Sequence, residues 1–273
     1  MMQDLSRLCI HTATTKPWSI EIAVEQYARA NVAGITVWRD ALTGRDPKTV
    51  GRRIRDAGLE VVSLCRGGFF TSVDADARAR ALAENLRAVE EAEALGAPLI
   101  VLVCGADPAQ ALDDSRAQII EGIRAVAGRA QDAGVRLAIE PLHPMYADAK
   151  SAVNTMRSAI DMCDTIQLPN VGVAVDVYHI WWDPDALEEI ARCGAADRLF
   201  AFHVCDWRVP TRDLLLDRGL MGEGCIDIPR FRSAVDEAGF SGFNEVEIFS
   251  TDYWSGDQSA YLQRIIEAYR QHV

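Results

Sequence analysis

The sequence predicts one α/β domain, a single (β/α)8 TIM barrel over residues 1–273. Short apolar segments alternate with segments of helical periodicity along the whole chain. Glycine lies near most of the predicted helix ends, and no Pro/Ser-rich linker divides the chain. Eight such repeats over about 250 residues match the usual length of this barrel. A doubly wound sheet is the alternative, and the even spacing of the repeats disfavours it.

Eight apolar segments account for the strands. The segment Leu99–Val103 (LIVLV) is too apolar to face water on either side, which is typical of a strand in a parallel sheet. The segment that begins at Val171 is similar, and it stops abruptly at Asp176. The predicted strands are Arg7–His11, Gly34–Trp38, Glu60–Cys65, Leu99–Val103, Arg136–Glu140, Val171–Asp176, Leu199–Val204 and Asn244–Ile248.

The helices follow from apolar residues at helical spacing between these strands. A long helix begins at Ser72 as its cap and ends before Gly96. The loop Arg66–Phe70 precedes it, and its paired glycines permit positive φ or the close approach of a ligand. The other predicted helices are Ile20–Ala30, Thr49–Ala57, about Asp113–Ala133, Ala152–Thr165, Pro184–Cys193, Ile228–Ala238 and about Gln258–Tyr269.

Composition excludes several classes of partner. Of the 273 residues 49% are hydrophobic and 25% charged, and the formal net charge is −12. Nucleic-acid binding depends on clustered Lys and Arg, whereas here the basic residues are scattered, so we expect no nucleic-acid partner. No run approaches the roughly 20 apolar residues of a membrane span, and no signal-peptide pattern opens the sequence. We therefore expect no membrane partner.

Cysteine usage indicates the compartment. The seven cysteines are odd in number, dispersed and never in a C-x-x-C pair. This pattern argues against a disulfide framework and against a zinc-thiolate site. A reducing, cytoplasmic environment is the prediction that follows.

Four polar residues stand at the carboxyl ends of predicted strands, where active sites of TIM barrels lie. Singly, Glu140 and Asp176 have a structural interpretation as caps, and His203 and Glu247 as packed residues. Together they would place three carboxylates and one imidazole at one mouth, where the carboxylates repel each other unless a cation lies among them. An oxygen-rich set with one histidine suits Mn²⁺, with Mg²⁺ or Co²⁺ as alternatives. We predict one divalent cation bound by Glu140, Asp176, His203 and Glu247.

Five short motifs carry a resemblance to a known family. They are Glu140-Pro141, the DVYH of Asp176–His179, the FHVCD of Phe202–Asp206, the GEGCIDI of Gly222–Ile228 and the spacing from Gly242 to Glu247. In this order they resemble the xylose-isomerase-like TIM barrel superfamily, of the sugar phosphate isomerase/epimerase type. The superfamily includes ketose 3-epimerases, hydroxypyruvate isomerase, inosose-processing enzymes and endonuclease IV.

The resemblance implies a mechanism and roles. In the sugar epimerases of this group the glutamates of strands five and eight bind the metal and move the proton, which implies catalytic roles for Glu140 and Glu247. The histidine of D-x-x-H contacts substrate oxygen, which implies that role for His179. An arginine usually follows the strand-seven histidine; Arg208 is the candidate here, one residue early. The implied reaction is abstraction of a proton next to a carbonyl that the metal polarises.

One departure from the epimerases leaves a second function open. After Glu140 the chain places His143 between two prolines, where it is either a packed loop histidine or a further general base. This element is similar to one in the larger subunit of bacterial C-glycoside deglycosidases, a branch of the same superfamily. That resemblance implies a lyase that cleaves 3-keto-glycosides with a small second subunit. A third reading, endonuclease IV, needs three metals and more than the five histidines present.

Aromatic residues past the strand ends complete the predicted site. Most large aromatics pack in cores, but Trp38, Phe70 and Trp207 lie just past strand ends and are predicted to form an apolar wall for a sugar or an aglycone. The leading prediction is thus a metal-dependent isomerase or epimerase of a sugar or keto-sugar. The sequence leaves open the identity of the sugar, its phosphorylation and whether the chain forms a homo-oligomer.

Overall fold

The computed structural model describes residues 4–273 and confirms the predicted barrel. Eight parallel strands close in the order β1-β10-β7-β6-β5-β4-β3-β2. They are β1 (Leu8–His11), β2 (Gly34–Trp38), β3 (Glu60–Gly68), β4 (Leu99–Val103), β5 (Arg136–Ile139), β6 (Val171–Asp176), β7 (Leu199–Val204) and β10 (Asn244–Val246). Strands that are neighbours in the barrel follow one another along the chain, except β1 and β10, which close it. Between β7 and β10 the chain also forms a separate two-stranded sheet of β8 (Asp206–Trp207) and β9 (Arg218–Gly219).

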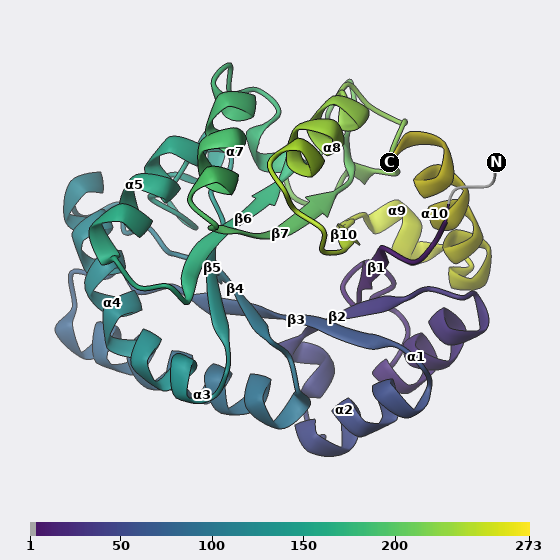
Figure 1. The fold of residues 1–273 in the computed structure, drawn as a ribbon, viewed down its shortest axis with the longest axis horizontal. Helices are drawn as coiled ribbons and strands as arrows, with labels where there is room; N and C mark the ends of the chain where they lie inside the picture. The colour runs from purple at the N-terminus through teal and green to yellow at the C-terminus, as the bar shows by residue number, and fades with distance from the viewer. Residues whose placement is uncertain (1–3) are drawn as a thin grey trace.

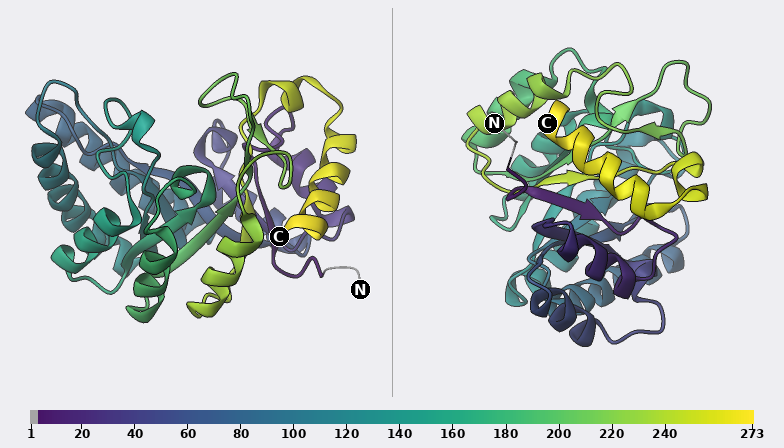
Figure 2. Two further views of the ribbon diagram at one scale, coloured as in Figure 1. Left: turned by 90° about the horizontal axis from the view of Figure 1, so that it is seen from above. Right: turned by 90° about the vertical axis from the view of Figure 1, so that its right-hand side faces the viewer.

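Helices surround the strands in chain order (Figure 1). The long ones are α1 (Ile20–Arg29), α2 (Pro47–Asp56), α3 (Ala75–Leu95), α4 (Leu112–Asp132), α5 (Met156–Ile166), α7 (Ala186–Ala195), α8 (Ile228–Glu237) and α10 (Gln258–His272). Shorter ones are η1 (Arg39–Leu42), η2 (Pro144–Tyr146), α6 (Val177–Ile180) and α9 (Thr251–Ser255). Figure 2 (right) shows α10 running beside β1, which brings the last helix against the first strand. Among residues 4–273, no helix is both long and apolar enough to cross a membrane.

Three local predictions differ from the structure. The segment expected as a loop from Arg66 continues β3 as far as Gly68, because Gly67 and Gly68 pair with β4. The cap of α3 is Asp74, whose side chain accepts the N–H of Asp76, and not Ser72. The helix expected from Ala152 begins only at Met156, since Thr155 and Ser158 form a capping box there.

Two apolar layers hold the barrel. Side chains that point outward from the strands, such as Ile100 and Leu102 of β4, pack against the helices in one continuous core. Side chains that point inward form a smaller cluster in the lumen, which includes Leu99 and Val101 of the same strand. This alternation follows from the two-residue period of a strand, and it determines which residues reach the mouth of the barrel.

Candidate metal centre and mouth cavity

Each predicted ligand follows an inward-pointing residue by two positions. Ala138, Ala174 and Ala201 belong to the lumen cluster. Two positions later come Glu140, Asp176 and His203, which therefore also point inward at the next level up. Glu247 stands in the same way two positions after Glu245 of β10. The small alanines below leave room for polar side chains at the mouth.

The structure brings the four predicted ligands together. One donor atom from each of Glu140, Asp176, His203 and Glu247 lies within 4.8 Å of the others, and all four side chains are buried. Nδ1 of His203 is 3.1 Å from Oε1 of Glu140, yet neither atom has a hydrogen bond. Two donors that bind one ion at about 2.1 Å lie roughly 3 Å apart, so these orphaned atoms suit a shared cation. The residues present thus fit a divalent metal.

Asp176 combines both interpretations considered from the sequence. Its Oδ1 accepts the N–H of Tyr178 at 2.8 Å and so caps the short helix α6. Its Oδ2 remains directed at the cluster, 3.1 Å from Arg218. Burial raises the pKa of Asp176 to about 7, although the charge of Arg218 opposes this shift. The carboxyl therefore carries a proton part of the time near neutral pH when no metal is bound.

Arg218, on β9, is the cation that the structure places beside these carboxylates. Its Nη1 is 2.7 Å from Oε2 of Glu247 and 3.1 Å from Oδ2 of Asp176. Its guanidinium lies 4.2 Å from the ring of Tyr178 and 5.1 Å from that of Phe249. The pKa of Glu247 is held well below its usual range, because the charge of Arg218 and the contact with His11 outweigh burial.

A second polar layer supports the ligands from below. Nδ1 of His11 lies 3.1 Å from Oε1 of Glu247, and its Nε2 lies 3.2 Å from Oε2 of Glu245. Glu245 also accepts hydrogen bonds from Thr36 at 2.6 Å and Ser63 at 3.2 Å. Burial lowers the pKa of His11, but its bonds to the two glutamates outweigh it and raise the pKa to about 9. A charged His11 thus links the two carboxylates and orients Glu247.

Above the four ligands lies a cavity of about 400 Å³, within the range of small-molecule sites. It opens at the carboxyl ends of the strands. Its walls are Trp38, Arg66, Phe69, Val103, Glu140, Leu142, Tyr146, Ala149, Lys150, His179, Leu215, Arg218, Glu247 and Phe249.

This arrangement agrees with comparison to known proteins. A sequence model of the xylose isomerase-like TIM barrel family matches residues 23–272. The chain belongs to this family. It is 44% identical to protein SMc04130 from Sinorhizobium meliloti 1021, whose crystal structure superposes with a TM-score of 0.94 over 98% of each chain.

Two further relatives of this family are more distant. Inosose isomerase of Bacillus licheniformis is 27% identical over 194 residues, which cover 68% of this chain. The match spans 66% of that relative, just under two thirds of its length. The crystal structure of the IOLI protein with a zinc atom has a TM-score of 0.84, covers 96% of each chain and is 21% identical, so it indicates the fold.

Two of the residues predicted to contact the substrate line the mouth cavity. Trp38 forms part of its wall. His179 also lines it, and its Nδ1 accepts the N–H of His143 at 3.2 Å. This bond turns Nε2 toward Arg218 and Asp176, at 3.2 and 3.6 Å. Burial and the charge of Arg218 keep the pKa of His179 well below its usual value, so the ring is neutral.

Arg208 and Phe70, by contrast, do not line the mouth cavity. The guanidinium of Arg208 bonds to Asp217 and Glu223, so its predicted contact with substrate stays a prediction. Phe70 is buried against α4, where its ring would touch a Cβ placed on Gly122 at 2.4 Å. The chain turns at Phe69, which has a φ of 54°, so that Phe69 and not Phe70 faces the cavity.

His143 and Trp207 also lie outside the residues that line the cavity. The two rings stack with centroids 5.1 Å apart, and the ring of Trp182 meets His143 edge-on. Nδ1 of His143 accepts the N–H of Met145, so that atom is occupied. This packing places both residues outside the cavity wall, so the roles of His143 as a general base and of Trp207 as a sugar wall stay predictions. The deglycosidase alternative gains no support from this geometry.

Three functional candidates escaped the sequence prediction. His11 is the last residue of β1, and Glu245 shares the inward face with Glu247, so strand position alone would have indicated both. No such signal exists for Arg218. It lies 15 positions after His203, in a segment without periodicity, and only the pairing of β8 with β9 brings it to the centre.

Proposed function

We propose that this chain is a divalent-metal-dependent isomerase or epimerase that acts on a sugar or keto-sugar. The observation that carries the proposal is the cluster of four donor atoms at the base of the mouth cavity, two of which are buried without a hydrogen bond. Similarity to inosose isomerase supports the substrate class. Mn²⁺ is the favoured ion, with Mg²⁺ and Co²⁺ as alternatives, because oxygen donors predominate.

The mechanism follows from the charges around the cavity. A divalent cation held by Glu140, Asp176, His203 and Glu247 would polarise the carbonyl of the substrate. Glu140 and Glu247 both line the cavity, so each carboxylate can take up or return a proton at the carbon next to that carbonyl.

Two further groups hold the substrate and its developing charge. His179 is neutral and lines the cavity beside Arg218, where its ring can contact a sugar oxygen. Arg218 donates to Glu247 and lines the cavity, so its positive charge would lie near the negative charge that develops as the proton leaves. Trp38 and Phe249 supply apolar surface to the wall of the cavity.

Hydrogen exchange in D₂O tests the proposal directly. Protein loaded with Mn²⁺ is incubated with an inosose or with D-fructose, and deuterium at the carbon next to the carbonyl is followed by NMR. We expect exchange that stops on chelation and returns when Mn²⁺ is restored. Glu247→Gln should lower the exchange rate by at least about 100-fold, because it removes both a base and a metal ligand.

Glu188→Gln is the matched control. Glu188 is exposed on α7, so the same chemical change there should leave exchange unaltered. Circular dichroism should show that both variants fold. Full exchange by a metal-free preparation would contradict the mechanism.

A further inference from the structure

The mouth cavity carries more positive charge than the rest of the chain leads one to expect. Its walls contain three cationic side chains, Arg66, Lys150 and Arg218, and two carboxylates, Glu140 and Glu247. The whole chain has a formal net charge of −12. A divalent cation at the predicted centre would add two further positive charges. With Asp176 of the same centre included, three cationic side chains face three carboxylates, so it is the ion that would make the mouth cationic in this acidic protein.

Arg218 is compensated within the fold, but Arg66 is not. Arg218 contacts the carboxylates of Asp176 and Glu247. The side chain of Arg66 makes no hydrogen bond or ion pair with any residue from 4 to 273. Its guanidinium lies instead 4.3 Å from the ring centroid of Phe69. A cation–π contact holds the charge in place and leaves the N–H donors of the guanidinium unused.

Lys150, elsewhere in the wall of the mouth cavity, is also held by a cation–π contact. Its Nζ lies 4.4 Å from the ring centroid of Tyr146, and within the described chain it too lacks a hydrogen bond or a carboxylate partner. Its backbone is fixed, because its carbonyl oxygen accepts the N–H of Gly105 at 2.8 Å. Burial, together with the charges of Arg218 and Arg66, lowers the pKa of Lys150. Each of these cations thus lacks a direct ion pair with a carboxylate among residues 4–273.

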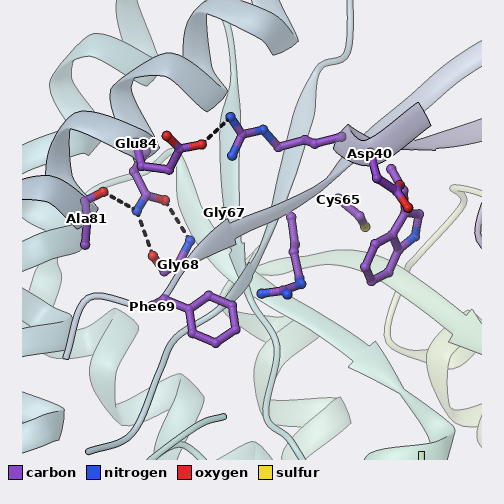
Figure 3. A pocket seen from close by; sticks show the side chains of 11 residues that line it. Asp40, Cys65, Gly67, Gly68, Phe69, Ala81 and Glu84 are labelled. Carbon is purple, nitrogen blue, oxygen red and sulfur yellow. Dashed lines mark hydrogen bonds and ion pairs between the residues drawn. The ribbon is translucent and has the colours of Figure 1, made fainter. Parts of the chain in front are cut away.

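A side cavity continues from Arg66. It has a volume of about 390 Å³ and shares Trp38, Arg66 and Phe69 with the mouth cavity. Figure 3 shows this space between Glu84 and Phe69 on one side and Cys65 and Asp40 on the other. Its other arginine, Arg39, is already paired with Glu84 and Glu91. Arg66 therefore supplies the free donors at the junction of the two cavities.

We propose that the substrate carries an anionic substituent, a carboxylate or a phosphate, which Arg66 and Lys150 bind. This inference rests on the proposed function, because it names the class of sugar that the same site accepts. A neutral sugar would leave two partly desolvated cations without a direct anionic partner, which is unfavourable. An anionic group satisfies both through charge-assisted hydrogen bonds, and arginine can bind it in bidentate fashion.

Three ketoses that differ only at carbon 6 test the inference, namely D-fructose, D-fructuronate and D-fructose 6-phosphate. Their binding to Mn²⁺-loaded protein is measured by calorimetry. We expect at least one of the two anionic ketoses to bind 10-fold or more tightly than D-fructose. A preference for D-fructuronate indicates a carboxylate, and a preference for D-fructose 6-phosphate a phosphate.

Substitution then assigns the preference to residues. Arg66→Met and Lys150→Met should each weaken binding of the anionic ketose about 10- to 100-fold and change D-fructose binding less than about 3-fold. Arg136→Met is the matched control, since Arg136 also lies over an aromatic ring, 4.6 Å from that of Phe200, but at the amino end of β5. Arg136→Met should change neither the binding of the anionic ketose nor that of D-fructose.

The outcomes separate this inference from the function on which it rests. Equal binding of the three ketoses, absence of binding, or equal losses for all three in the variants would overturn the anion site. Absence of deuterium exchange with every ketose, together with a preserved preference for the anions, would overturn the isomerase and leave the anion site standing.

Discussion

Asp206 offers a sharp test of how the Arg218 segment is held. This buried carboxylate follows β7 and accepts four backbone N–H groups. Those of Trp207 and Ile226 bond to Oδ1 at 2.8 and 3.0 Å, and those of Gly222 and Gly224 bond to Oδ2 at 3.0 and 2.9 Å. The segment that carries Arg218 to the four candidate ligands lies between these anchors; Figure 2 (left) shows it in green at the edge of the barrel.

Asp206→Asn keeps the shape of the side chain and removes one acceptor oxygen. The new amide group would then face two N–H donors in place of Oδ2. Each donor left without an acceptor costs about 1–2 kcal/mol, near the lower end of the range because Gly222 and Gly224 are partly reached by water. The substitution should thus lower the free energy of unfolding by about 2–4 kcal/mol.

Urea denaturation followed by circular dichroism measures this change. Asp213→Asn is the control, because Asp213 accepts two backbone N–H groups, of Leu215 and Leu216, at the single oxygen Oδ1 in an exposed turn. An asparagine there can keep both bonds, so no measurable loss is expected. A loss below about 1 kcal/mol for Asp206→Asn would refute the argument that the four bonds hold this segment.

Three further predictions concern the centre and its frame. Mn²⁺ affinity should rise with pH, because the ion must displace a proton from His203 and, below about pH 7, a second proton from Asp176. The pKa of His203 is about 10, because nearby carboxylates outweigh its burial. Calorimetry that finds constant affinity from about pH 6 to pH 8 would contradict this. His143→Ala should change deuterium exchange by less than about 3-fold, and a 100-fold loss would show that it acts as a base. Gly172→Ala should lower the free energy of unfolding in urea by about 1–3 kcal/mol, since its Cβ would lie 2.5 Å from the carbonyl oxygen of Arg198; wild-type stability would mean that β6 shifts freely.

The positions of the four candidate ligands were predictable because the strands carry their own geometric rule. A parallel strand buried on both faces is apolar until it reaches the mouth, so a polar residue at its end is conspicuous. Asp176 and His203 sit opposite each other in the register of β6 and β7, as that rule requires. The same rule applies to His11. The sequence placed this residue at the end of the first strand, but its contact with Glu247 was not predicted.

The remaining corrections come from segments without periodicity. Between β7 and α8 the chain returns on itself through the β8–β9 pair, and this places Arg218 inward and Arg208 outward. Phe70 was assigned to the site because β3 was expected to end at Cys65. The strand continues to Gly68, and the positive φ at Phe69 then reverses which side chain faces the cavity.

The closed strand order has a consequence for how such a site can change over evolution. All four candidate ligands come from one arc of consecutive strands, β5, β6, β7 and β10, whereas Trp38 and Arg66 come from β2 and β3 on the remaining arc. Because each arc has its own loops, substitutions in one leave the frame of the other intact. A lineage can therefore replace Trp38 and Arg66 while inheriting the four candidate ligands unchanged.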